Sequence, residues 1–115
     1  MGKGEKNMPE NENIGAGMSG KDIGAELYEK WLGGDEKAFD KIMDIYHDAL
    51  IFLVYGTVKN FADAEDIAAD AFAELIVHKN RYSFGCSLKT YLFSVARNKA
   101  IDRLRKRKRF ADSDI

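Results

Sequence analysis

The stretch DAEDIAADAFAELIVH, Asp63 to His78, indicates the fold class of the chain. Its apolar residues recur three and four positions apart, which is the spacing of one helix face and not the alternation of a strand. Asp63 is a residue type that commonly caps a helix N-terminus. The stretch therefore predicts an amphipathic helix with Asp63 as its N-cap. Its expected apolar face consists of Ile67, Ala71, Phe72, Leu75 and Ile76.

The other face of this predicted helix is acidic. Asp66, Asp70 and Glu74 follow one another at intervals of four residues, so they lie on one side of the helix. A face of this kind is often only a solvated surface, but it also suits a partner with a basic surface. Both readings remain open from these residues alone.

The segments before this helix show the same periodicity. A short helix over residues 22–32 is predicted from Ile23, Leu27 and Trp31, and Gly33-Gly34 is expected to stop it. Asp35 is expected to cap a long helix that runs to about Tyr55, and residues 56–62 are expected to form a connection. The apolar stripe of the long helix consists of Phe39, Ile42, Met43, Tyr46, Ala49, Leu50 and Leu53.

A last helix is predicted after the acidic one. Ser87 is expected to cap it, and it runs from Leu88 to about Arg109. Strict alternation is missing throughout, and no proline occurs between Lys21 and Phe110. The sequence therefore predicts an all-α fold, a small bundle of three to four helices. The residues of the last helix expected to face its core are Leu88, Leu92, Val95, Ala96 and Leu104.

The domain organisation follows from composition. Residues 1–21 hold half of the ten glycines and the only proline, and their few apolar residues cannot offset the entropy of ordering, so we expect a flexible leader. Residues 22–110 are expected to form the single helical domain. Residues 111–115 are expected to be a C-terminal tail that starts a linker.

Charge is distributed unevenly along the chain. Residues 94–109 contain eight of the 18 lysines and arginines and a single acid, Asp102, whereas the remainder has ten basic and eighteen acidic residues. Like charges four apart repel within a helix, and a polyanion would supply the missing counter-charge. The basic end therefore favours nucleic-acid contact. An anionic membrane surface or a protein partner are the alternatives.

Several functional classes are disfavoured. The single cysteine, Cys86, excludes an internal disulfide and suits a reducing cytoplasm, where we place the protein. No apolar run approaches the roughly 20 residues that cross a bilayer, so no membrane insertion is expected. His47 and His78 have acids at helical spacing, but bundle metal sites need ligands from several helices. We expect no metal, no cofactor and no enzymatic activity.

A polar loop with two aromatic residues, KNRYSFGC, precedes the last helix. Aromatic rings can stack on unpaired bases, and polar groups can bind base edges. Alternatively, Tyr82 and Phe84 pin the loop to the core. The base-binding reading predicts that Tyr82→Ala weakens binding at one base position while the melting temperature is nearly unchanged.

Two separated motifs resemble region 2 of bacterial sigma factors, especially the extracytoplasmic-function (ECF) group. The first is DAEDIAADAF from Asp63, and the second is YLFSVARNKAIDRLR from Tyr91. An upstream phrase, GGDEKAF, resembles the start of the first helix of this family. Ala69 and Tyr91 stand where the family usually has glutamine and tryptophan. The resemblance covers about residues 23–110, and it implies the sigma region 2 type of bundle.

The resemblance implies a partner for each surface. The acidic helix would bind the clamp helices of the largest subunit of core RNA polymerase, through Asp63, Glu65, Asp66, Asp70 and Glu74. The loop and the last helix would recognise and melt the −10 promoter element on the non-template strand. The implied DNA-binding residues are Asn80, Arg81, Tyr82, Phe84, Arg97, Asn98, Arg103, Arg105, Lys106, Arg107, Lys108 and Arg109.

Another role is compatible with the same resemblance. Sigma factors of this group normally continue into a second helical domain that reads the −35 element, whereas this sequence ends at Ile115. A sigma-like interaction module that binds polymerase or an anti-sigma factor without opening promoters is therefore the alternative function.

Overall fold

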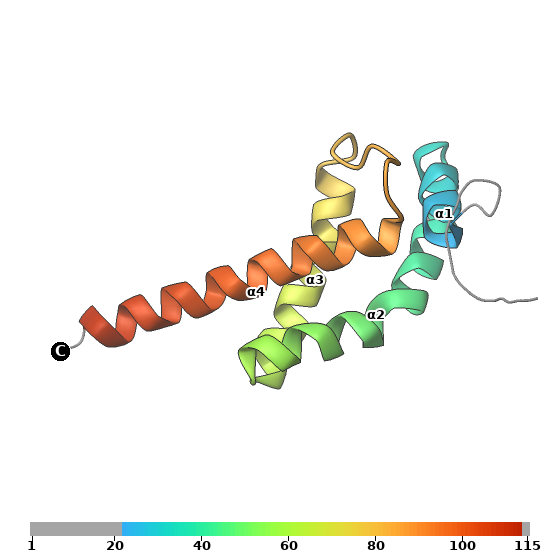
Figure 1. The fold of residues 1–115 in the computed structure, drawn as a ribbon. Helices are drawn as coiled ribbons and strands as arrows, with labels where there is room; N and C mark the ends of the chain where they lie inside the picture. The colour runs from blue at the N-terminus through green and yellow to red at the C-terminus, as the bar shows by residue number, and fades with distance from the viewer. Residues whose placement is uncertain (1–21, 114–115) are drawn as a thin grey trace, which may run out of the picture.

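The computed structural model describes residues 22–113, with side chains through Arg109. Four helices make up this part: α1 (Ile23–Leu32), α2 (Glu36–Val58), α3 (Phe61–Val77) and α4 (Leu88–Ser113). No strand occurs among the described residues, and the predicted all-α bundle is confirmed (Figure 1). The predicted leader lies outside the described residues, and α4 extends four residues beyond its expected end at Arg109.

The first two helices begin and end largely where the sequence predicts. Asp22 caps α1, and α1 ends at Leu32 before Gly33. Asp35 caps α2 through a hydrogen bond from the Lys37 amide. However, α2 continues through Gly56 to Val58, so the connection expected at Gly56 was wrong. One glycine costs a helix only about 1 kcal/mol relative to alanine, and the burial of Val58 one half-turn later offsets that cost.

The junction between α2 and α3 is therefore short. Lys59 adopts the left-handed conformation, with a φ of 58°, and ends α2. Asn60 caps α3 by accepting a hydrogen bond from the Asp63 amide at 2.9 Å. The expected Asp63 cap was wrong because the asparagine three residues earlier takes that place. Asp63 instead lies in the first turn of α3, where its carboxylate is turned toward α4.

The core forms where α2 packs against the other three helices. Its largest fully buried side chains are Tyr28, Ile42, Leu50, Val54, Ile67, Leu75, Leu88 and Leu92. Four residues of the predicted apolar faces are exposed: Ile23 by 53%, Ile76 by 43%, Leu104 by 36%, and Ala49.

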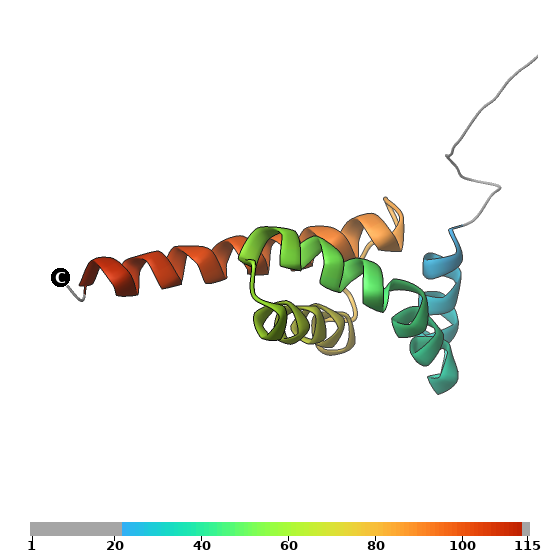
Figure 2. The same cartoon turned by 90° about the horizontal axis from the view of Figure 1, so that it is seen from below.

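α4 differs from the other helices in its length. Figures 1 and 2 show its C-terminal part continuing past the three other helices as a projecting rod. Its first half contributes buried residues such as Leu92, Ala96 and Ala100, while residues 104–109 are all exposed. The described part of the chain contains no helix that is long and apolar enough to cross a membrane.

Candidate nucleic-acid interface

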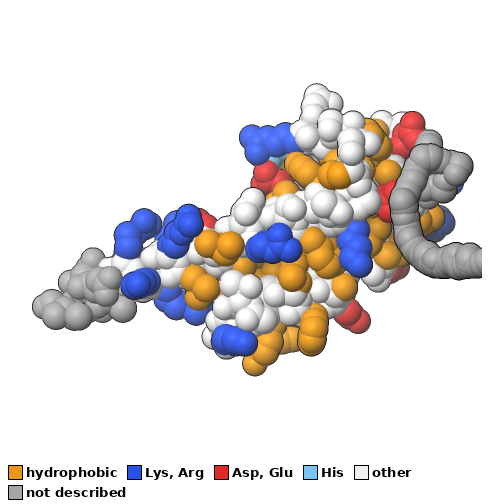
Figure 3. All heavy atoms as spheres, in the orientation of Figure 1, with side chains coloured by type: hydrophobic (Ala, Val, Ile, Leu, Met, Phe, Trp, Pro, Cys, Tyr) orange, Lys and Arg blue, Asp and Glu red, His pale blue; other side chains and the backbone are white. Residues whose placement is uncertain are grey.

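The projecting part of α4 carries the basic end that the sequence predicts. Blue side chains surround this rod in Figure 3. Arg105, Lys108 and Arg109 are exposed and form no ion pair with any side chain that the structure describes. Lys106 pairs with Asp102 one turn earlier at 3.2 Å. Unpaired cations on an exposed helix can approach a phosphate backbone without first breaking internal contacts.

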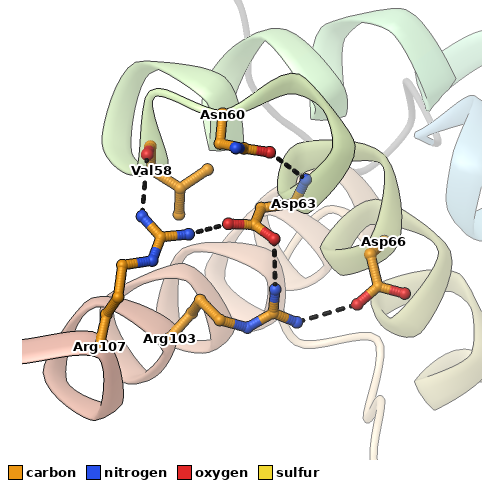
Figure 4. A network of polar contacts seen from close by, with 6 residues as sticks. All are labelled: Val58, Asn60, Asp63, Asp66, Arg103 and Arg107. Carbon is orange, nitrogen blue, oxygen red and sulfur yellow. Dashed lines mark hydrogen bonds and ion pairs between the residues drawn. The ribbon is translucent and has the colours of Figure 1, made fainter. Parts of the chain in front are cut away.

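The root of the rod is held by ion pairs to α3. The Arg103 guanidinium contacts Asp63 at 3.0 Å and Asp66 at 2.9 Å, and Figure 4 shows it between these two carboxylates. Arg107 also pairs with Asp63, and it donates to the Val58 carbonyl at 3.4 Å. Two residues of the predicted DNA-binding set are therefore paired with two of the predicted polymerase-binding set.

A second group of ion pairs lies at the other end of α3. Glu74, whose side chain is 20% exposed, contacts Arg81 at 3.1 Å and Lys99 at 3.4 Å. Lys99 was not among the predicted site residues, although its place in the basic segment was visible. Among the predicted acids, only Glu65 and Asp70 form no ion pair with a described side chain. The acidic face is thus less available than its spacing alone suggested.

Between α3 and α4 lies an open groove of about 190 Å³. It is lined by Ile67, Asp70, Lys99, Asp102, Arg103 and Lys106. Both charge signs line it, so a bound segment would need alternating charges or polar groups. The groove joins the exposed part of the acidic face to the basic helix.

The loop between α3 and α4 presents only some of its predicted contacts. Asn80 and Arg81 are exposed, and Phe84 is 45% exposed. Tyr82 is only 4% exposed. Its ring lies 5.3 Å from that of Tyr91 and 4.6 Å from that of Phe84, and its hydroxyl donates to the Cys86 carbonyl. This position is the one that the packing alternative predicts for Tyr82.

Phe84 has an unusual backbone. Its φ is 67°, in the left-handed region that side chains with a Cβ rarely adopt. The neighbouring Gly85, which lacks a Cβ, would adopt this conformation at lower cost. The backbone conformation of Phe84 must be maintained by contacts of the loop with its surroundings. Of the two aromatic rings in this loop, that of Phe84 is half exposed and that of Tyr82 is buried.

The tyrosines at this end of the molecule have raised pKa values and stay uncharged at neutral pH. Burial raises the pKa of Tyr82, and the carboxylate of Asp22 raises it further. Burial also raises the pKa of Tyr28 and Tyr91, and it raises the pKa of Tyr46 to about 12. The contacts of these rings and hydroxyls therefore persist across neutral pH.

The remaining predicted residues lie on the surface of α4. Arg97 and Asn98 are exposed in the first half of the helix, between the loop and the ion pairs of Arg103. The predicted DNA-binding residues thus extend along one helix from the loop to the projecting end. Within residues 22–109, no three His, Cys, Asp or Glu side chains gather as metal ligands would.

Comparison with known proteins identifies the family of the chain. The family model of sigma-70 region 2 matches residues 42–110. The ECF RNA polymerase sigma factor SigW of Bacillus subtilis (strain 168) is 40% identical over 75 residues. That alignment covers 65% of this chain and 40% of the relative, so the chain spans less than half of the relative's length. The matched residues include α3, the loop, α4 to Phe110 and most of α2, and on this basis the chain belongs to the sigma-70 region 2 family.

Proposed function

We propose that this chain is the part of an ECF sigma factor that binds core RNA polymerase and recognises and melts the −10 promoter element. The observation that carries the proposal is the exposed set of polar, aromatic and basic side chains along the loop and α4, within the segment matched by the family. The similar Bacillus protein is named an RNA polymerase sigma factor. That name supports the choice of polymerase and promoter DNA as partners.

The DNA-binding part divides between the two ends of α4. The basic rod binds phosphates, which gives affinity and register but little sequence information. The loop binds an unpaired base of the non-template strand, with Asn80 and Arg81 at the base edge and Phe84 as a stacking surface. Tyr82 supports this loop from beneath, since its ring is buried.

The polymerase-binding part uses the acidic face of α3, with the clamp helices of the largest subunit as the partner. Asp70 is the best test residue because it is exposed and its loss breaks no ion pair of the described part. Asp70→Lys should weaken binding to core polymerase about tenfold or more, which is the scale of a close interfacial charge contact. Asp40→Lys, the same reversal at an exposed acid of α2, is the control.

The function is tested with core polymerase and a −10 oligonucleotide whose non-template strand is unpaired. We expect the chain to bind core polymerase and to retain the −10 sequence in preference to a scrambled sequence. Polymerase binding without any preference would support the interaction-module alternative instead. Equal effects of Asp70→Lys and Asp40→Lys would exclude the acidic face of α3 as the polymerase surface.

A further inference from the structure

α1 contacts the loop between α3 and α4 at its entry, its middle and its exit. This helix lies outside the segment matched by the family model, which begins at residue 42. We propose that α1 is a brace that positions residues 79–87, and that Asp22 and Tyr28 are positioning residues for the base-binding loop. The role in base recognition rests on the proposed function.

Asp22 fixes the exit of the loop. A single carboxylate oxygen of Asp22 accepts hydrogen bonds from the Ala25 amide at 2.8 Å and from the Leu88 amide at 2.9 Å. It therefore caps α1 and α4 together. α4 also has a local cap, since the Ser87 hydroxyl accepts from the Thr90 amide at 3.0 Å. The hydrogen bond from the Leu88 amide to Asp22 thus does more than cap α4, because it also links α4 to α1.

Gly24 allows this link to be short. A Cβ atom at Gly24 would lie 2.5 Å from the Tyr46 hydroxyl and 3.0 Å from the Leu88 Cβ. Real side-chain atoms do not approach so closely without displacing their neighbours. The glycine therefore lets the first turn of α1 lie directly against the first residue of α4.

Tyr28 fixes the entry of the loop. Its hydroxyl donates to the Leu75 carbonyl at 2.7 Å and lies 3.2 Å from the Lys79 carbonyl. Its side chain is fully buried. The Lys79 ammonium in turn lies 5.0 Å from the centre of the Trp31 ring, also on α1. The end of α3 and the first loop residue are thus tied to the same short helix.

The ring of Tyr28 also supports the middle of the loop. Its centre lies 5.8 Å from the Tyr82 ring in an edge-to-face arrangement and 6.2 Å from the Phe84 ring. Phe84 holds the left-handed backbone conformation described above, which needs such surrounding contacts. α1 therefore supports the loop from the core side, opposite the exposed residues that would touch a base.

The test compares two substitutions of Asp22 that both remove its charge but differ in side-chain length. Asp22→Ser keeps a hydroxyl that caps Ala25 but is too short to reach Leu88 as well. Asp22→Asn keeps the length and an acceptor oxygen, so it should retain the hydrogen bonds to the Ala25 and Leu88 amides and behave like the wild type. Asp35→Ser is the matched control, because Asp35 caps α2 and has no bond to the loop or α4. It removes the same charge.

The first readout is binding of unpaired −10 oligonucleotides by the holoenzyme, with each position changed in turn. Losing the Leu88 hydrogen bond should reduce discrimination at one base about five- to tenfold. Binding to a scrambled strand and helical content should change no more than in Asp35→Ser. A uniform loss for all sequences, or no difference from Asp35→Ser, would overturn the positioning role.

The second readout is hydrogen exchange of the amides of residues 79–87, which does not depend on DNA. Exchange should be faster in Asp22→Ser than in Asp35→Ser or Asp22→Asn. If the wild-type holoenzyme shows no −10 preference, the proposed function fails, while faster exchange still supports the brace. Equal exchange in all three variants would exclude the brace even if the −10 preference is present.

Discussion

The two ends of α4 are attached to the rest of the protein by different forces. At the N-terminal end, the amide of the buried Leu88 donates a hydrogen bond to the Asp22 carboxylate, and aromatic rings pack around the preceding loop. At the other end, Arg103 and Arg107 bridge to α3 through ion pairs, and the helix then projects alone. Packing of neutral groups is nearly insensitive to salt, whereas exposed ion pairs are screened by it.

This difference suits two kinds of recognition. A loop that selects one base needs a fixed shape, because a displaced contact loses its geometry. A helix that follows phosphates needs mobile, solvated charges and little fixed geometry. In this molecule, the fixed attachment lies beside the loop and the exchangeable attachment lies beside the basic rod.

The largest effect should come from removing a ring at the packed end. Tyr82→Ala should lower the free energy of unfolding by about 3–5 kcal/mol, as for other buried aromatic residues. Chemical denaturation measures it, with Phe84→Ala as the control because that ring is half exposed. Equal losses in the two variants would mean that Tyr82 is not the residue that pins the loop.

That prediction follows the packing alternative for Tyr82 and not the base-binding one, because the Tyr82 ring is buried. Periodicity locates helices because backbone hydrogen bonds and apolar stripes are local, and it found all four helices, although it misplaced the end of α2, the start of α3 and the end of α4. Whether a loop aromatic faces inward depends on α1, more than fifty residues earlier, whose Tyr28 ring meets it. No local pattern carries that contact.

The charge pattern shows the same limit. The sequence correctly indicated an acidic helix and a basic helix, but each was considered separately. Their pairing depends on how α3 and α4 cross, which brings Asp63 within reach of Arg103 forty residues later. Spacing predicts which charges share a helix face, but not which opposite charges on another helix will neutralise them.

The second prediction concerns the salt dependence of DNA binding by the projecting end. If about four cations contact duplex phosphates, the log–log slope should be about −3 to −4. Arg105→Gln with Lys108→Gln should reduce its magnitude by about 1.8, since about 0.9 is lost per contact. Lys106→Gln with Arg107→Gln should reduce it less, because both residues already have internal partners.

Duplex affinity measured at several salt concentrations between about 50 and 200 mM gives these slopes, because affinity changes strongly over that range. Both double variants remove two charges from the same helix, so total charge is controlled. A larger reduction in the Lys106 and Arg107 variant would show that the internally paired residues carry the phosphate contacts.

The third prediction is a loss of stability at alkaline pH. Burial raises the pKa of Tyr46 to about 12, compared with about 10 in an unfolded chain. Between these values the unfolded state loses its proton while the folded state keeps it, so the unfolded state is favoured increasingly. Stability should therefore fall as pH rises from about 10 to about 12, by at most about 1.4 kcal/mol per pH unit for this residue.

Denaturation at several pH values in this window measures the fall, and Tyr46→Phe should make it shallower. Tyr82 and Tyr28 contribute in the same direction, because burial also raises their pKa values. An unchanged slope in Tyr46→Phe would show that the hydroxyl of Tyr46 reaches water in the folded state.

The smallest expected effect separates the paired acid Asp66 from the unpaired acid Asp70. Both are exposed on α3, one turn apart, but only Asp66 contacts Arg103. Asp66→Asn should lower the free energy of unfolding by about 0.2–1 kcal/mol, the usual range for an exposed ion pair, while Asp70→Asn should have almost no effect. A double-mutant cycle with Arg103→Gln isolates the pair.

The same two variants test whether the ion pairs compete with phosphates. General electrostatics predicts that removing either charge raises duplex affinity equally, since the two sites are close and the charge change is identical. Release of Arg103 predicts a larger gain for Asp66→Asn, and this excess should vanish when Arg103 is glutamine. If the excess is absent at low salt, the Arg103 pairs only fasten α4 to α3 and do not restrain its contact with DNA.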